Sequence, residues 1–148
     1  MLKLNLAAGG RLELPGYALL AVMKPSDGSN PSSVIYDLGA GVQIDPLADQ
    51  YGFVRKLARD GGTFENPIEV ETIEKLAGES ADAVTVARGK ITMSRTAIVG
   101  RRDLMDDADG ARAQLFVRFG TATSTLLVSE SLDQMDGIDT AQPASAAA

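Results

Sequence analysis

The stretch AQLFVRFGTATSTLLVSESLDQMD, residues 113–136, carries the clearest structural pattern in the chain. Leu115, Val117 and Phe119 fall on alternate positions, as expected for a strand with one buried face. Small and polar residues then supply a turn at 120–124, and a second β-rich run follows it. The pattern predicts a β-hairpin without any evident chemistry of its own.

A short helical turn is expected directly after this hairpin. Ser129 and Ser131 are both candidates for its N-cap, because a serine hydroxyl satisfies amide groups left free at a helix start. Leu132 and Met135 would then lie on the apolar side of the turn. The stretch is therefore read as two strands followed by a helix.

Alternating apolar residues and glycine turns recur along the rest of the chain. They predict hairpins from residues 2–6 with 12–14, from 34–38 with 42–44, and from 83–87 with 90–99, the last joined at Arg88-Gly89. Residues 17–23 are read as a strand, 25–33 as a loop, and 68–72 as a half-exposed strand up to Ile73. A turn is expected at 78–82.

Two segments leave alternatives open. Residues 45–58 place Leu47, Tyr51, Val54 and Ala58 on one helical face, but Gly52 permits an extended reading. Residues 101–110 are acidic and are expected to form a loop or a short helix. The predicted fold is mainly β, an antiparallel sandwich or barrel-like domain with β-hairpins and one to three short helices.

One domain is expected over residues 1–139, because the length of 148 residues suits a single hydrophobic core. Residues 140–148, TAQPASAAA, form a low-complexity tail of a kind that is ordinarily disordered.

The hairpin sequence has an echo earlier in the chain. Residues 34–52 and 115–137 share an apolar strand, a glycine, a second strand and an Asp-Gln pair. This alignment matches Gly39 with Gly120, and Asp49-Gln50 with Asp133-Gln134 if the second copy holds three extra residues. We take it as a hypothesis of an internal repeat.

Composition removes much of the usual enzyme chemistry. The chain has no cysteine and no histidine, which excludes disulfides, thiolate catalysis, Cys-based metal sites and the commonest general base. A net charge of −6 disfavours binding to nucleic acid phosphates or to anionic lipid. We expect no nucleic acid partner and no membrane association, and the protein reads as soluble.

Residues 34–41, VIYDLGAG, resemble the glycine-rich motif that opens the cofactor site of Rossmann-like methyltransferases. The resemblance implies that Asp37, Gly39 and Gly41 would take the family's acidic and glycine positions around S-adenosylmethionine. It covers eight residues and then departs from the family, since Gln43 replaces a usual glycine and Pro46 stands where a long helix should start. A glycine turn in a hairpin is the preferred interpretation, and no cofactor is expected.

Two further candidates for chemistry are read as surface features. Asp106, Asp107 and Asp109 precede Gly110, but the spacing places apolar residues at calcium-loop positions that need oxygen ligands. The serines lack a histidine partner and a G-x-S-x-G motif. We therefore predict no catalytic residue and no metal site.

These observations favour a non-enzymatic structural protein that packs against itself or a larger assembly. The specific expectation is a small virion component, such as a phage capsid decoration or capsid-associated protein, made in the host cytoplasm. Phe116, Phe119 and Pro143 in the tail are the candidate interface residues, since Phe116 and Phe119 must point to opposite faces of a strand. The alternative is a cytoplasmic ligand-binding or regulatory β module, with residues 25–33 and 39–41 around a pocket.

Overall fold

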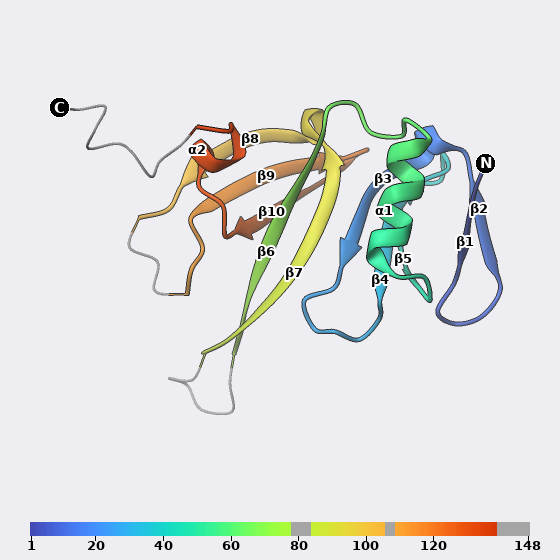
Figure 1. Ribbon diagram of the computed structural model, residues 1–148, viewed down its shortest axis with the longest axis horizontal. Helices are drawn as coiled ribbons and strands as arrows, with labels where there is room; N and C mark the ends of the chain where they lie inside the picture. Colours follow the sequence, from blue (N-terminus) through green and yellow to red (C-terminus); the bar gives the residue numbers. More distant parts are fainter. Residues whose placement is uncertain (78–83, 106–108, 139–148) are drawn as a thin grey trace.

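The computed structural model describes residues 1–77, 84–105 and 109–138, and these form a mainly β protein with two short α-helices. All strand pairs are antiparallel and most are hairpins, which confirms the predicted fold class. The described strands do not close into a barrel. They are arranged along the length of the molecule, from the β1–β2 hairpin at one end to β8 at the other (Figure 1).

The elements occur twice in the same order. The first unit contains β1 (Leu2–Asn5), β2 (Arg11–Leu14), the 3-10 turn η1 (Gly16–Ala18), β3 (Leu19–Lys24), β4 (Ser32–Asp37), β5 (Val42–Leu47) and α1 (Tyr51–Asp60). The second unit contains β6 (Pro67–Ala77), β7 (Val84–Ser94), the 3-10 turn η2 (Arg95–Ala97), β8 (Ile98–Asp103), β9 (Ala113–Phe119), β10 (Ala122–Val128) and α2 (Leu132–Met135). Each unit is thus a hairpin, a 3-10 turn, a three-stranded meander and a helix.

The strand after each 3-10 turn carries the same irregularity. The pairing of β3 with β4 shifts register between Leu19 and Ala21, and that of β8 with β9 shifts between Ile98 and Gly100. Extended backbone precedes both turns, with φ −67° and ψ 149° in the first unit and φ −70° and ψ 141° in the second. Leu19 is therefore equivalent to Ile98, and Ala21 to Gly100.

In both units the first strand runs beside the end of the last strand. The amide of Ala48 donates to the carbonyl of Asn5 at 2.8 Å, and the amide of Ser129 donates to the carbonyl of Glu71 at 3.0 Å. These bonds make Asn5 the equivalent of Glu71.

A carboxylate completes each of these junctions. Asp49 accepts the backbone amide of Asn5 at 2.7 Å, and Glu130 accepts the backbone amide of Glu71 at 3.0 and 3.1 Å. A strand amide left without a ladder partner must find another acceptor, and both units supply one from the residue before the helix N-cap. The repeat therefore extends to hydrogen bonding.

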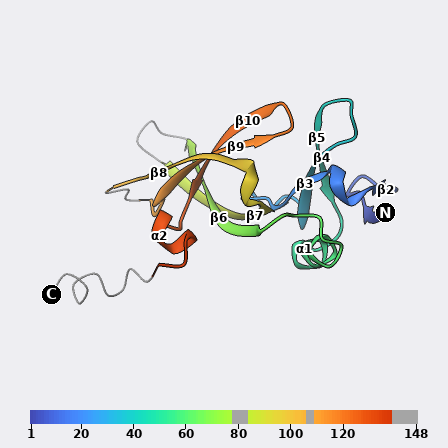
Figure 2. The same cartoon turned by 90° about the horizontal axis from the view of Figure 1, so that it is seen from above.

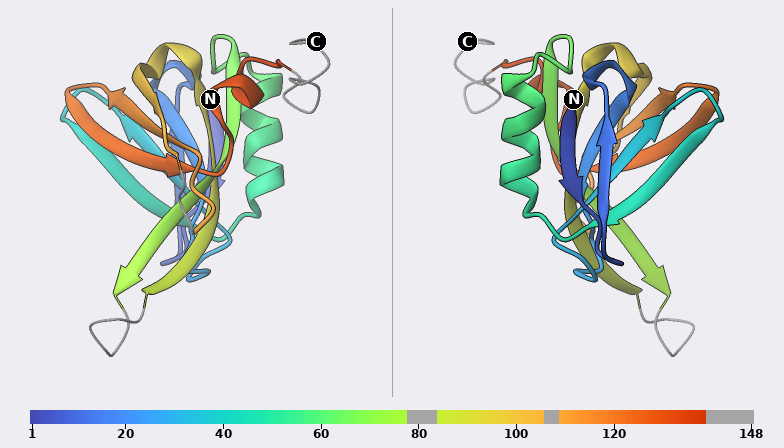
Figure 3. Two further views of the ribbon diagram at one scale, coloured as in Figure 1. Left: turned by 90° about the vertical axis from the view of Figure 1, so that its left-hand side faces the viewer. Right: turned by 90° about the vertical axis from the view of Figure 1, so that its right-hand side faces the viewer.

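The strands of both units lie in one continuous order. The sheets are β1-β2 and β5-β4-β3-β7-β6-β10-β9-β8, and a bridge from Leu6 to Leu47 connects β1 with β5. The overall order is β2-β1-β5-β4-β3 for the first unit, followed by β7-β6-β10-β9-β8 for the second. Viewed along the molecule, the β4–β5 and β9–β10 hairpins project to one side and both helices lie on the other (Figure 3).

The two units join where β3 pairs with β7, and we call this pairing the seam. Ala21 lies opposite Met93, and Val22 lies opposite Thr92. Beyond the seam, a Cβ on Gly89 of β7 would lie 2.3 Å from the carbonyl oxygen of Lys24, so only glycine fits there. The predicted turn at Arg88-Gly89 is therefore wrong: β7 passes straight through it, and the glycine serves a close backbone approach.

Two hydrophobic cores support this arrangement. The first lies in the first unit and includes Leu14, Val34, Leu47 and Val54 of α1. The second belongs mainly to the second unit but also takes in Ala21 and Ile35 of the first. Figure 2 shows the helices on one side of the sheet and the turns of the β4–β5 and β9–β10 hairpins on the other.

Several sequence expectations need correction. The helical alternative for residues 45–58 is confirmed, but the helix starts at Tyr51, and Leu47 belongs to β5. Residues 16–18 are a 3-10 turn, so the strand predicted at 17–23 starts at Leu19. Strand β8 covers 98–103, part of which we expected as a loop or helix, and the predicted turn at 78–82 lies outside the described residues.

Residues 113–136 fold as their sequence pattern predicts. Strands β9 and β10 form the hairpin, and Ser131, not Ser129, caps α2 by accepting the amide of Gln134 at 3.1 Å. In the echo, Gly39 and Gly120 occupy equivalent turns, both with positive φ. The Asp-Gln part of that alignment is wrong, since the N-caps Gln50 and Ser131 are equivalent and no insertion is needed.

Replacement of Gly89 by alanine tests the close approach beside the seam. We expect Gly89→Ala to lower the free energy of unfolding by roughly 1–3 kcal/mol, because the new methyl group must push backbone atoms apart. Urea denaturation monitored by circular dichroism measures the change.

Gly52→Ala is the matched control. Gly52 lies within α1 and a Cβ there meets no atom within 4 Å, so this variant should gain roughly 0.5–1 kcal/mol from helix propensity. Equal effects of the two substitutions would contradict the assigned role of Gly89.

Candidate functional site

A polar cluster lies where α1 reaches across the seam. The hydroxyl of Tyr51, in α1, donates to Glu69 of β6 at 2.7 Å and lies 2.6 Å from the hydroxyl of Thr92 in β7. Arg55, one turn further along α1, forms an ion pair with the same Glu69 carboxylate, and its guanidinium lies 5.7 Å from the ring centroid of Tyr51. The helix of the first unit is thereby bound to the first two strands of the second.

The electrostatics of this cluster suit a structural link. Tyr51 is 8% exposed, and burial raises its pKa, with Glu69 adding to the effect. Burial alone would raise the pKa of Glu69, but hydrogen bonds from Tyr51 and Arg55 hold it below its usual value. The tyrosine therefore stays protonated and the glutamate stays charged, which keeps the donor and acceptor matched.

A second tyrosine is held inside the β4–β5 hairpin. The hydroxyl of Tyr36 donates to the carboxylate of Asp45 and lies 2.9 Å from Oε1 of Gln43. The hydrogen bond to Asp45 raises the pKa of Tyr36 to about 12. This group also stays protonated near neutral pH and ties neighbouring strands together.

The glycine-rich motif at residues 34–41 forms strand β4 and the turn that follows it. The carboxylate of Asp37 accepts the amides of Gly39 at 2.7 Å and Gly41 at 3.3 Å, so it closes its own turn. The next strand, β5, pairs antiparallel with β4, whereas a Rossmann site needs a helix and a parallel strand. The preferred hairpin interpretation is confirmed.

The acidic segment gives no metal centre among the described residues. Asp106 and Asp107 lie outside the described residues, while Asp109 pairs with Lys75 at 3.2 Å. Residues 1–77, 84–105 and 109–138 contain no group of three or more acidic side chains placed to hold a metal ion.

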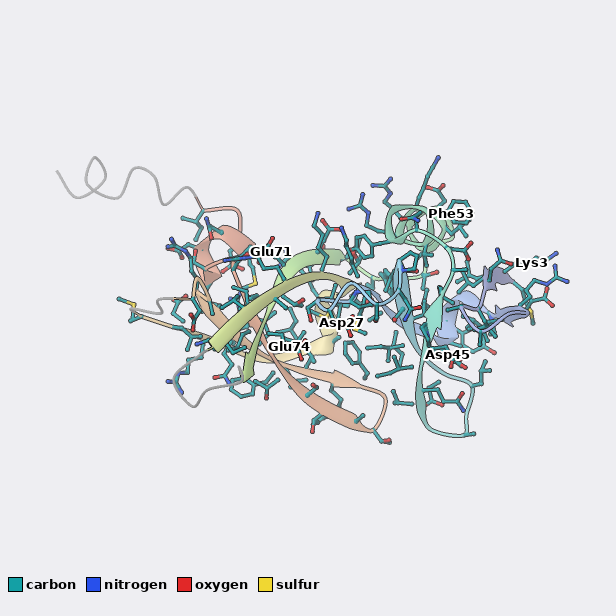
Figure 4. The ribbon with its side chains drawn as sticks, turned by 90° about the horizontal axis from the view of Figure 1, so that it is seen from below. Lys3, Asp27, Asp45, Phe53, Glu71 and Glu74 are labelled. Carbon is teal, nitrogen blue, oxygen red and sulfur yellow. The ribbon has the colours of Figure 1, made fainter. Side chains whose placement is uncertain are left out.

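One hollow of about 580 Å³ lies between the 25–28 turn, β6, β7 and β10. Pro25, Ser26 and Asp27 line it, but the turn at residues 39–41 does not, so the two loops proposed for a pocket are separate. The hydroxyl of Ser26 donates to Glu74 across it, and Figure 4 shows Asp27 and Glu74 near the middle of the molecule.

The two candidate interface phenylalanines lie on opposite faces of β9, as their spacing in a strand requires. Phe119 is 6% exposed and lies in the second core, while Phe116 is 40% exposed on the other face of β9. Phe116 packs beside Gly100 of β8, where an added Cβ would lie 3.4 Å from its ring. Pro143 lies outside the described residues.

Sequence reasoning missed the seam cluster and the second half of the end strand β8, whereas it predicted the other end strand, β2. Tyr51, Glu69 and Thr92 come from three elements, and no spacing in the sequence indicates that they meet. Neither 3-10 turn was predicted, because residues 17–23 and 90–99 were both read as continuous strands. Strands β2 and β8 lie at the two ends of the described strand order and form the candidate interaction site.

Comparison of the chain with protein-family models, with curated proteins and with solved structures returned no match. In the part of the chain that the structure describes, no helix is long and apolar enough to cross a membrane.

The raised pKa values of Tyr36 and Tyr51 predict a loss of stability at high pH. Both keep their protons above pH 10.0, the ordinary pKa at which the unfolded chain releases them. Because the folded state then binds more protons, the free energy of unfolding falls as pH rises from 10 towards 12. We expect a smaller fall in Tyr51→Phe, measured by urea denaturation at about pH 9 and pH 11.

Near neutral pH the same variant should lose roughly 1–2 kcal/mol, because Glu69 and Thr92 lose a buried hydrogen-bond partner. Tyr17→Phe is the control, since Tyr17 is 87% exposed and should change neither value. The same pH dependence in Tyr51→Phe and wild type would contradict the role given to this hydroxyl.

Proposed function

We propose that this chain is a non-enzymatic structural protein that works by assembling with copies of itself or within a larger protein assembly. The observation that carries the proposal is its construction from two units joined edge to edge, with strands β2 and β8 left at the ends of the described order. An unpaired strand edge is a template for pairing with another chain.

Phe116 supports the same proposal. Ile35 pairs with Ala21 and Ile44, and Phe116 pairs with Gly100 and Thr125, so the two residues are equivalent. Ile35 is 5% exposed because the second unit packs beside it, whereas Phe116 is 40% exposed at the end of the molecule. A partner on this face would remove an aromatic side chain from water, which favours association.

The specific version of the proposal is a virion component, such as a phage capsid decoration or capsid-associated protein. It is supported by an acidic chain without cysteine or histidine, and by a fold built from two units that pair edge to edge. Sedimentation of the purified protein, and its co-purification with particles, test the general and the specific statements in turn.

A ligand-binding module is the second candidate, favoured by the hollow beside Pro25, Ser26 and Asp27. Such a module should be a monomer whose melting temperature rises when its ligand is added. A monomer of 15.5 kDa at all concentrations would favour this candidate over assembly.

Substitution of the two phenylalanines separates assembly from folding. We expect Phe116→Ser to weaken self-association while lowering the free energy of unfolding by less than about 1 kcal/mol, as at other surface positions. Analytical ultracentrifugation measures association and urea denaturation measures stability.

Phe119→Ser is the matched comparison and should cost roughly 3–5 kcal/mol, because it empties a site in the second core. Equal destabilisation by both substitutions would mean that Phe116 serves the fold of the monomer and not an interface.

A further inference from the structure

We propose that β8 of one molecule pairs antiparallel with β2 of the next, repeating between chains the seam that β3 and β7 form within the chain. The proposal rests on the assembly function above and specifies the contact between molecules, the pairing of β8 with β2, which we call the joint. Strand β8 is the counterpart of β3, and β2 is the counterpart of β7, so each molecule carries one half of the seam at each end.

The internal seam fixes the register of the joint between molecules. Its pairs are Ala21 with Met93, Val22 with Thr92, Met23 with Ile91, and Lys24 with Lys90. Exchanging each residue for its counterpart gives Gly100 with Leu14, Arg101 with Glu13, Arg102 with Leu12, and Asp103 with Arg11. Counterparts in β2 and β7 follow from the hairpin registers, in which Leu4–Leu12 matches Val70–Ile91.

The charges on the two end strands are complementary in this register. Arg101 meets Glu13, and Asp103 meets Arg11, so both charged pairs join opposite signs. All four side chains are exposed in the molecule. Opposite charges placed directly across an antiparallel pair stabilise it, and like charges destabilise it, so a one-residue or two-residue slip would be less favourable.

The cluster across the seam has a counterpart at the joint with its signs reversed. Arg55 stands five residues after the N-cap Gln50, and Asp136 stands five residues after the N-cap Ser131. Glu69 lies two residues before Glu71, as Lys3 lies two residues before Asn5, and Glu71 is the counterpart of Asn5. The ion pair between Arg55 and Glu69 thus corresponds to Asp136 and Lys3 of neighbouring molecules.

These contacts form one alternating set of charges. Within a molecule, Arg101 already binds Asp136 at 2.7 Å, and Lys3 lies opposite Glu13 in the β1–β2 hairpin. Figure 4 shows Lys3 at the outer end of the molecule, away from β8. Joining the ends places Arg101 beside Glu13 and Asp136 beside Lys3, so each of these four charges has two neighbours of opposite sign.

The joint is heterologous, because the two edges that meet are different. Repeating it adds molecules head to tail and gives a ring if the rotation closes, or a filament if it does not. Charged residues on an edge strand can instead keep a monomer from pairing with other chains. Such protection would not require complementary charges in one register, nor a match between β8 and β2 in particular.

Cysteine cross-linking tests the joint, because the chain has no cysteine of its own. Glu13→Cys and an isotopically labelled Arg101→Cys are prepared separately, mixed, and oxidised gently. We expect on the order of ten times more disulfide dimer from this mixture than from Arg11→Cys with Arg101→Cys, in which the thiols are two residues out of register and beyond the Cα reach of about 7 Å.

Mass spectrometry identifies which chains are joined, and sedimentation of the wild type gives the particle mass. Mixed dimers, with little dimer from either variant alone, support the joint. Dimers of like with like, or no disulfide dimer from the mixed variants although the wild type sediments above 15.5 kDa, overturn the joint and leave the assembly function standing. A wild type that remains monomeric and variants that do not cross-link overturn both.

Discussion

The pairing of β3 with β7 is the interaction on which the rest of the structure depends. It makes one continuous strand order from two five-stranded units, and it brings Ala21 and Ile35 into a core shared by both units. Beside it, the backbone at Lys24 lies so close to β7 that Gly89 can carry no side chain. Without this pairing, each unit would expose a strand edge and part of its apolar surface to water.

Comparison of the two units shows which constraints the fold imposes. The backbone amides at Asn5 and Glu71 both receive a carboxylate, from Asp49 and Glu130, although the strands around them differ in length and sequence. Unsatisfied amides are costly wherever they are buried, whereas side chains above the sheet can change if their neighbours change with them. Hydrogen-bonding positions are therefore repeated, and residue types are not.

The sequence predicted those parts of the fold that depend on local patterns. The β9–β10 hairpin and the Ser131 cap follow from period-two alternation and from residues within a few positions of each other. The continuous β7 and the Tyr51 cluster did not follow, because the reason for Gly89 lies in β3 and the partners of Tyr51 lie in β6 and β7. A glycine required by a distant backbone has the same appearance in sequence as a glycine in a turn.

The distance along the chain between the two sides of the seam has a consequence for folding kinetics. The β3–β4–β5 and β8–β9–β10 meanders pair strands that are neighbours in the sequence. In contrast, β3 pairs with β7, which follows it in the sequence only after β4, β5, α1 and β6. Contacts between distant segments carry a larger loop-closure entropy and tend to form late. Substitutions along the seam should therefore act mainly on the unfolding rate, which a chevron analysis of Val22→Ala would measure.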